Sequence, residues 1–228
     1  MAQKQALALV AGAGPGLGQA LMQRFAQGGY RVIGLSRSPH HANDDTNSVL
    51  LDLADAQSVS TKLADLIAHY GTPAIVIHNA AQLAISPFLE TSEETFEQLW
   101  RNMVLSAFNL AQATLPAMVQ TGKGAFVVSG ATASLRGGAN FAAFASAKFA
   151  LRGLTQSLAR EFQPKGLHIA HVILDGLIDT QASRERTRGD PARMMKAEDI
   201  AQTYWHLAHQ PISTWTQELD LRPHSETF

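Results

Sequence analysis

The stretch Ala6-Leu-Ala-Leu-Val-Ala11-Gly12-Ala-Gly14-Pro-Gly16-Leu-Gly18 decides the fold that we predict for this chain. An apolar run of six residues leads directly into a glycine-rich turn, and an amphipathic stretch, Leu17–Gln27, follows. Closely spaced glycines allow a tight turn and a close approach of the backbone to a ligand, while the first amides of a helix face negative charge. The order of strand, turn and helix therefore predicts a site for the phosphates of a dinucleotide.

The rest of the chain repeats this alternation of apolar strands and amphipathic helices. Further strands are expected at Arg31–Leu35, Val49–Leu53, Ala74–His78, Ala125–Ser129 and His168–Leu174, with a weaker one at Gln217–Leu221. Further helices are expected at Gln57–Tyr70, Ser92–Gln120, Phe141–Phe162 and Ala197–Ala208. Continuous apolar strands separated by helices are typical of a parallel sheet covered on both faces. The pattern predicts an α/β fold, a doubly wound parallel sheet of the Rossmann type, as one domain over residues 1–228.

Composition excludes several classes of protein. A formal net charge of −1 over 228 residues argues against a nucleic-acid partner, which would need a broad basic face. The chain has no cysteine and no apolar run of about eighteen residues, so we expect no disulfide, no thiolate ligand and no membrane partner. The nine histidines complete no metal-ligand motif, and no metal site is predicted. Without a signal-peptide pattern at the start, a cytoplasmic location is the expectation.

Gly12, Gly16 and Gly18 fit the spacing G-x-x-x-G-x-G, the glycine pattern of short-chain dehydrogenases. Lys148 and the residues after it, Phe-Ala-Leu-Arg-Gly-Leu-Thr-Gln-Ser-Leu-Ala-Arg-Glu, are also similar to a helix of that family. The chain thus resembles a divergent subgroup of the classical short-chain dehydrogenase/reductase family, over nearly its whole length. The resemblance implies an NAD(P)-dependent oxidoreductase that forms a homodimer or homotetramer through the helix containing Lys148.

The end of the second predicted strand indicates which dinucleotide binds. NAD-binding Rossmann proteins have an acidic residue there for the ribose hydroxyls. This chain has Ser36 and Arg37, which remove the repulsion toward a 2′-phosphate and add a planar cation for it. NADP(H) is therefore preferred, with NAD(H) as the alternative, and Arg37 as a solvated loop cation is the competing interpretation.

The resemblance also carries over other cofactor contacts. Asp52 would bond the adenine amino group, Asn79 matches the second asparagine of the family's Asn-Asn-Ala-Gly, and Gly176 and Thr180 match Pro-Gly-x-x-x-Thr. Asp175 replaces the proline of that motif and brings an ionisable carboxylate near the site. A turn or helix cap is the preferred interpretation, and a group on the proton route is the alternative. The predicted cofactor-binding residues are Gly12, Gly14, Gly16, Leu17, Gly18, Ser36, Arg37, Asp52, Leu53, Asn79, Ala80, Lys148, Gly176 and Thr180.

The catalytic positions of the family are largely substituted. Phe144 stands where Tyr-x-x-x-Lys would place the tyrosine, and Phe141 fills the alternative spacing. Phenylalanine neither gives nor takes a proton. Ala131 occupies the serine register and Met103 the asparagine register, so only Lys148 is kept.

Nearby residues offer substitutes for the missing groups. Ser129, Thr132 or Ser134 would supply a hydroxyl, although capping of a turn explains these residues at least as well. Asn102 lies one residue from the asparagine register. One residue rotates a helix by about 100°, so we expect Asn102 to face elsewhere unless a π-bulge intervenes. His78 is interpreted as a core histidine.

Two functions remain. One is an oxidoreductase that transfers a hydride between NADP(H) and a small carbonyl or alcohol by a non-standard proton route. The other is a pseudoenzyme that binds NADP(H) as a sensor or partner subunit. An arginine-rich flap at about 181–196, predicted to be irregular and solvated, would shape the substrate pocket.

Overall fold

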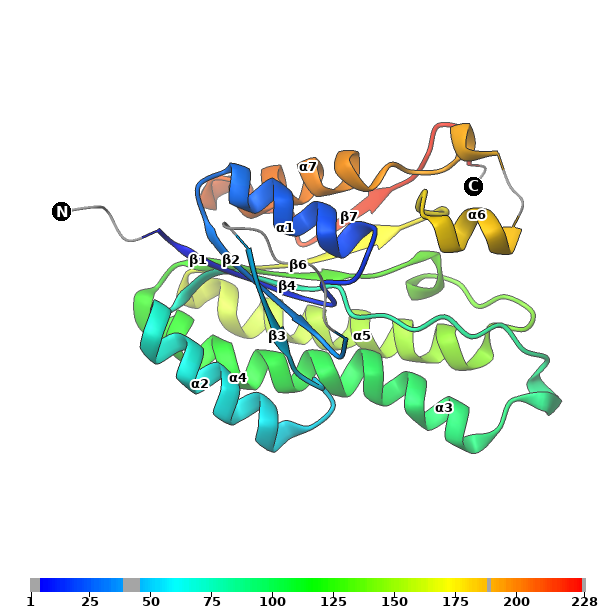
Figure 1. Ribbon diagram of the computed structural model, residues 1–228, viewed down its shortest axis with the longest axis horizontal. Coiled ribbons are helices and arrows are strands. Elements are labelled where there is room, and N and C mark those ends of the chain that lie inside the picture. Colours follow the sequence, from blue (N-terminus) through cyan, green and yellow to red (C-terminus); the bar gives the residue numbers. More distant parts are fainter. Residues whose placement is uncertain (1–4, 39–45, 188–189, 227–228) are drawn as a thin grey trace.

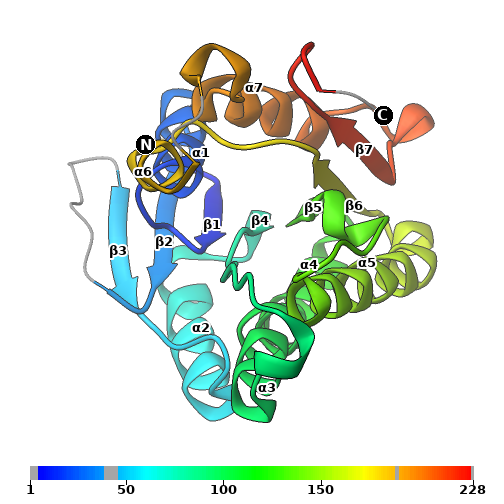
Figure 2. The same ribbon diagram turned by 90° about the vertical axis from the view of Figure 1, so that its right-hand side faces the viewer.

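The computed structural model describes residues 5–38, 46–187 and 190–226. Seven parallel strands form one sheet in the order β3-β2-β1-β4-β5-β6-β7 (Figures 1 and 2). The strands are β1 (Leu7–Ala11), β2 (Arg31–Ser36), β3 (Thr46–Leu50), β4 (Pro73–His78), β5 (Gly124–Ser129), β6 (Leu167–Leu174) and β7 (Glu218–Leu221). The chain order reverses between β1 and β4, which is where doubly wound sheets bind ligands. The predicted fold class is confirmed.

Helices cover both faces of the sheet, as Figure 2 shows from the end. The α-helices are α1 (Leu17–Gln27), α2 (Ala56–Tyr70), α3 (Glu93–Trp100), α4 (Ser106–Thr121), α5 (Ala142–Phe162), α6 (Gln181–Thr187) and α7 (Ala197–Ala208). Helices α1 and α7 pack in one hydrophobic cluster, and α2, α4 and α5 in another. Alternate residues of β1 pack into the two clusters. Ala8 and Val10 lie on one face of the sheet, and Leu9 and Ala11 lie on the other. Both cores thus hold the β1–α1 turn in place.

Three predicted segments differ from the structure by more than one residue at an end or in their internal structure. The third strand is Thr46–Leu50 and does not extend to residue 53. Leu51 and Leu53 are buried although they follow the strand, and Asp52 begins a turn that leads to α2. The predicted helix 92–120 is α3 and α4 joined by a π-helix, Arg101–Leu105. The flap is not wholly irregular, because it contains α6 and a 3₁₀ turn, Pro191–Arg193. Residues 188–189 of the flap lie outside the described residues.

Within the described ranges, no helix is long and apolar enough to cross a membrane.

Candidate functional site

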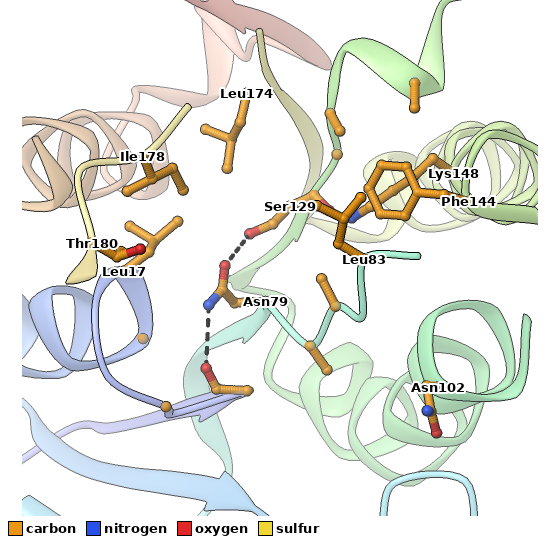
Figure 3. Close-up of a pocket in the computed structure, with 18 of the residues that line it drawn as sticks. Leu17, Asn79, Leu83, Asn102, Ser129, Phe144, Lys148, Leu174, Ile178 and Thr180 are labelled. Atoms are coloured by element: carbon orange, nitrogen blue, oxygen red, sulfur yellow. Dashed lines mark hydrogen bonds between the residues drawn. The ribbon is translucent and has the colours of Figure 1, made fainter. Parts of the chain in front are cut away.

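A pocket of about 920 Å³ opens at the carboxyl edge of the sheet. Its walls come from the segments that follow β1 to β6, so residues far apart in sequence face one another across it (Figure 3). Of the predicted site residues, Gly16 alone does not line the pocket; it packs behind the wall against Thr180. The fold thus brings the other predicted site residues together around one pocket, and the role of each residue remains a prediction.

The β1–α1 turn accepts only glycine at three positions. Gly12 has φ +86°, and a Cβ there would lie 2.5 Å from the backbone nitrogen of Ala80. A Cβ on Gly18 would lie 2.3 Å from the carbonyl oxygen of Gly12. Gly16 has φ +91°, and its Cβ would lie 2.7 Å from the methyl group of Thr180. The turn is thus packed against both β4 and the flap, and its bare backbone fits a diphosphate at the start of α1.

Ser36, Arg37 and Asp52 form the pocket wall beside β2 and β3. The Ser36 hydroxyl donates to the carbonyl oxygen of Ser38 at 2.7 Å, which fixes the turn that carries Arg37. The Arg37 side chain is exposed, so it is accessible to a ligand phosphate. The Asp52 carboxylate accepts a hydrogen bond from the Ala54 amide at 2.9 Å and keeps lone pairs for a ligand amine.

A buried hydrogen-bond chain runs beneath the pocket from α7 to the glycine turn. The Asn79 amide donates to the carbonyl oxygen of Gly12 at 3.2 Å and its oxygen accepts from the Ser129 hydroxyl at 2.9 Å, as Figure 3 shows. The Tyr204 hydroxyl lies 2.8 Å from the Ser129 hydroxyl. Because the Ser129 proton goes to Asn79, the Tyr204 hydroxyl is the donor to Ser129, and burial raises the pKa of Tyr204. Ser129, a candidate catalytic hydroxyl, is thus already bonded on both sides.

Lys148 reaches the same residue from α5. Its ammonium group donates to the carbonyl oxygen of Ser129 at 2.9 Å, and only 2% of the residue is exposed. Burial lowers the pKa of Lys148 to about 8. The Phe144 ring, centred 5.8 Å from this nitrogen, lines the pocket beside it (Figure 3). An apolar ring and a buried cation therefore lie side by side at the pocket wall.

Thr132 and Asp175 meet at the pocket wall, although 43 residues separate them. The Thr132 hydroxyl donates to the Asp175 carboxylate at 2.5 Å. Asp175 is 3% exposed, and the guanidinium groups of Arg136 and Arg222 lie 3.6 and 3.4 Å from its oxygens. The interpretation of Asp175 as a cap of a turn or helix overlooked this cluster of side chains.

A π-helix does intervene at Arg101–Leu105, which was the stated exception, and Asn102 lines the pocket wall. The wider turn adds one residue and changes the phase of the helix at that point. The Asn102 amide donates to the Gln82 side chain at 2.5 Å, while Met103 is fully buried in the cluster that contains Leu99. Sequence register alone placed Met103 at this site, since a π turn leaves no clear signal in composition.

Histidines near the site are structural. His78 is buried, and its Nε2 lies 2.8 Å from the Ser106 hydroxyl. Burial, with a smaller contribution from the Lys148 ammonium group, lowers the pKa of His78 to about 3, so the ring is neutral at neutral pH. This agrees with its interpretation as a core histidine. In the described part of the chain, no three histidine or acidic side chains come together as a metal site would require.

The flap covers the outer side of the pocket. Gly176 and Thr180, just before the flap, line the pocket. The Thr180 hydroxyl accepts a hydrogen bond from the Ser183 amide at 3.1 Å and so caps the start of α6. Arg184 pairs with Asp179 at 2.5 and 2.8 Å, outside the pocket. Arg186 on the same helix lines the pocket. Sequence reasoning missed Tyr204 and Arg136, because a core tyrosine on an amphipathic helix and a loop arginine carry no motif.

Comparisons with known proteins agree with this geometry. Residues 6–191 match the family model described as short chain dehydrogenase. The 3-oxoacyl-[acyl-carrier-protein] reductase of Salmonella typhimurium is 26% identical over 228 residues, covering 93% of each chain. A short-chain dehydrogenase from Rhodopseudomonas palustris superposes with a TM-score of 0.79 at 32% identity, covering 97% of this chain and 100% of that one. The closed form of a serine dehydrogenase complexed with NADP⁺ superposes with a TM-score of 0.87 at 22% identity, covering 97% of this chain and 96% of that one.

Proposed function

Because the chain belongs to the short-chain dehydrogenase/reductase family, we propose that it binds NADP(H) in this pocket and transfers a hydride to or from a small carbonyl or alcohol substrate. The observation that carries the proposal is the buried Lys148, held by Ser129 at the pocket wall. Burying a cation costs free energy. A bound cofactor that bonds Lys148 explains why the chain keeps this cost.

The cofactor fits the residues that line the pocket. The glycine turn offers backbone amides to the diphosphate, and the exposed Arg37 offers a permanent cation to the 2′-phosphate. Lys148 is placed to bond the nicotinamide ribose. The bound cofactor supplies the hydride chemistry, and the chain holds it in place and excludes water.

Proton transfer must take another route, since the Phe144 ring carries no proton. General acid catalysis contributes typically about 10²–10⁴-fold, so turnover survives the missing tyrosine if the hydride stays aligned. A second candidate function is a nucleotide-binding pseudoenzyme. The Phe144 ring favours it, because it fills the acid position with an apolar side chain.

Titration with NADPH and NADH, followed by fluorescence of the reduced nicotinamide, tests cofactor binding. NADPH is expected to bind more tightly than NADH. Arg37→Glu should abolish that preference, whereas Arg160→Glu, which changes an exposed arginine on α5 outside the pocket, should not. Failure of the native protein to bind either cofactor at millimolar concentration would refute both functions.

A screen of carbonyls with NADPH and of alcohols with NADP⁺, followed by absorbance at the nicotinamide band, separates the two functions. Turnover that Lys148→Ala abolishes supports the oxidoreductase. Phe144→Tyr should raise turnover by restoring the family's acid, and Phe96→Tyr, at an exposed position of α3 outside the pocket, is its matched control. Cofactor binding with no turnover in either variant or in the native protein favours the pseudoenzyme.

We also propose that two copies associate through α5. Phe149 on α5 and Phe108 on α4 are 44% and 45% exposed, and large exposed apolar side chains favour burial against a partner. Size-exclusion chromatography with light scattering should show a dimer or tetramer, which Phe149→Glu weakens. A native monomer would refute this assembly.

A further inference from the structure

A buried carboxylate at the pocket wall has no role in the hydride chemistry described so far. Asp175 follows β6 directly, and its backbone amide donates to the carbonyl oxygen of Leu221 at 2.8 Å. Its side chain is 4% exposed. Burying a carboxylate is costly unless it is paired and hydrogen-bonded. Asp175 is both, and its partner in the hydrogen bond, Thr132, also lines the pocket.

The direction of the hydrogen bond determines what Thr132 can do. A threonine hydroxyl carries one proton and two lone pairs. The proton points to the Asp175 carboxylate, so the lone pairs remain to accept a hydrogen bond from a ligand. Thr132 is also the neighbour of Ala131, which occupies the family's serine register.

Hydrogen bonds of two buried side chains, Ser134 and His171, hold the turn that carries Thr132. The Ser134 hydroxyl accepts the Ala131 amide at 3.2 Å, and Nε2 of His171 lies 3.1 Å from the same hydroxyl. A turn fixed by buried side chains keeps the Thr132 hydroxyl in one orientation. This preorganisation is what proton transfer requires.

We propose that Thr132 and Asp175 form the proton-transfer pair that replaces the missing tyrosine, an inference that rests on the proposed oxidoreductase function. In alcohol oxidation, the carbon-bound hydrogen leaves with its electron pair for the nicotinamide of NADP⁺. The hydroxyl proton of the substrate passes to the Thr132 oxygen as the Thr132 proton passes to Asp175. The products are a carbonyl compound, NADPH and one proton on Asp175. Carbonyl reduction runs through the same steps in reverse.

Several charged side chains surround Asp175. Arg136, from the loop after β5, and Arg222, from the segment after β7, face its two oxygens. Arg222 also pairs with Asp220 on β7. Lys148 on α5 and Glu226 line the same pocket. The Arg136 side chain is 53% exposed, so solvent reaches the cluster there and can take up the proton that Asp175 receives.

The test compares variants on an alcohol substrate identified in the screen. Asp175→Asn keeps an acceptor for Thr132 but cannot take its proton, and Thr132→Val removes the hydroxyl. Each should lower kcat by about 10²-fold or more, with NADPH affinity unchanged. Thr132→Ser should restore turnover. Asp220→Asn removes a carboxylate that also pairs with Arg222 but lies outside the pocket, so kcat should persist in this control.

A second readout does not depend on turnover. In protein labelled with carbon-13 in the aspartate carboxyl groups, the Asp175 resonance is the one that Asp175→Asn removes. In the NADP⁺ complex, this resonance should report protonation of the carboxylate at the pH where kcat/KM of the native protein declines on the acid side.

Each outcome decides the inference. Native turnover with Asp175→Asn equally active overturns the pair and leaves the oxidoreductase proposal standing. Loss of NADPH binding together with turnover makes Asp175 a cofactor or structural residue and also overturns the pair. An Asp175 carboxylate that stays ionised while kcat/KM declines overturns it as well. NADPH binding with no native turnover overturns the oxidoreductase proposal and the pair together.

Discussion

Replacement of Lys148 by methionine should change how the free energy of unfolding depends on pH. Burial lowers the pKa of Lys148 from 10.5 to about 8 in the folded chain. Between these two values the unfolded chain holds the proton more tightly, so protonation favours unfolding there. Stability should therefore rise as the pH increases from about 8 to 10.5, and below about pH 8 the full penalty of the buried charge is present.

The size of the effect follows from the same two values. Each pKa unit corresponds to about 1.4 kcal/mol, so the change from 10.5 to about 8 amounts to about 3 kcal/mol. Lys148→Met removes this term and also takes the donor from the carbonyl oxygen of Ser129. Losing that donor costs about 1–3 kcal/mol at every pH. The two contributions are separable because only the first varies with pH.

Urea unfolding of the native protein and Lys148→Met, at a series of pH values from 7 to 11, measures both contributions. The native protein should gain about 3 kcal/mol relative to the variant across this range. Lys165→Met, which removes an exposed ammonium group from the turn after α5, controls for loss of a lysine charge. A native-minus-variant difference that stays constant with pH would refute the claim that Lys148 is held as a destabilised cation.

Three further predictions test the packing of the site. Gly12→Ala places a Cβ 2.5 Å from a backbone nitrogen at φ +86°, so NADPH affinity should collapse in a fluorescence titration; normal affinity would contradict the steric argument. Tyr204→Phe removes the donor to Ser129 and should lower the free energy of urea unfolding by about 1 kcal/mol and weaken NADPH binding, whereas unchanged values would mean that this contact supports nothing. Glu218→Gln breaks the two-point pair with Arg152, at 2.7 and 2.8 Å, and should cost about 1 kcal/mol near neutral pH. The hydrogen bond with Arg152 lowers the pKa of Glu218, so this stability is present above the unfolded pKa and is lost as the pH falls through the folded value; a gap from the native protein that persists in acid would contradict the assignment.

The glycine-rich turn is the part of the pocket whose geometry the sequence predicts best, because the physical requirements there are local. The apolar run of β1, the glycines and the start of α1 are adjacent in the chain, and their order alone specifies a phosphate-binding turn. A Cβ at Gly12 or Gly18 would collide with backbone atoms, so both positions need glycine. The glycine spacing in the sequence already indicates this need. Helices α1 and α7 also begin and end where the hydrophobic pattern predicts.

The rest of the pocket depends on contacts between distant residues. The bond between Thr132 and Asp175 depends on β5 and β6 lying side by side, and no local pattern encodes the distance between two side chains. The contact between Tyr204 on α7 and Ser129 at the end of β5 was not predicted for the same reason. The end of β3 was misplaced because the buried Leu51 and Leu53 give the same apolar signal as paired strand residues.

The π-helix at Arg101–Leu105 limits the insertions and deletions that this part of the chain can tolerate. Deleting one residue of this turn would leave an ordinary α-helix, and everything on one side of the deletion would rotate by about 100° relative to the other side. Asn102 would leave the pocket wall, and Leu99 would leave the cluster it shares with Ala143 and Ala147 on α5. Removal of the extra residue would thus have to coincide with replacement of several core side chains. Lineages that carry this turn should therefore retain its length even where the individual residues vary.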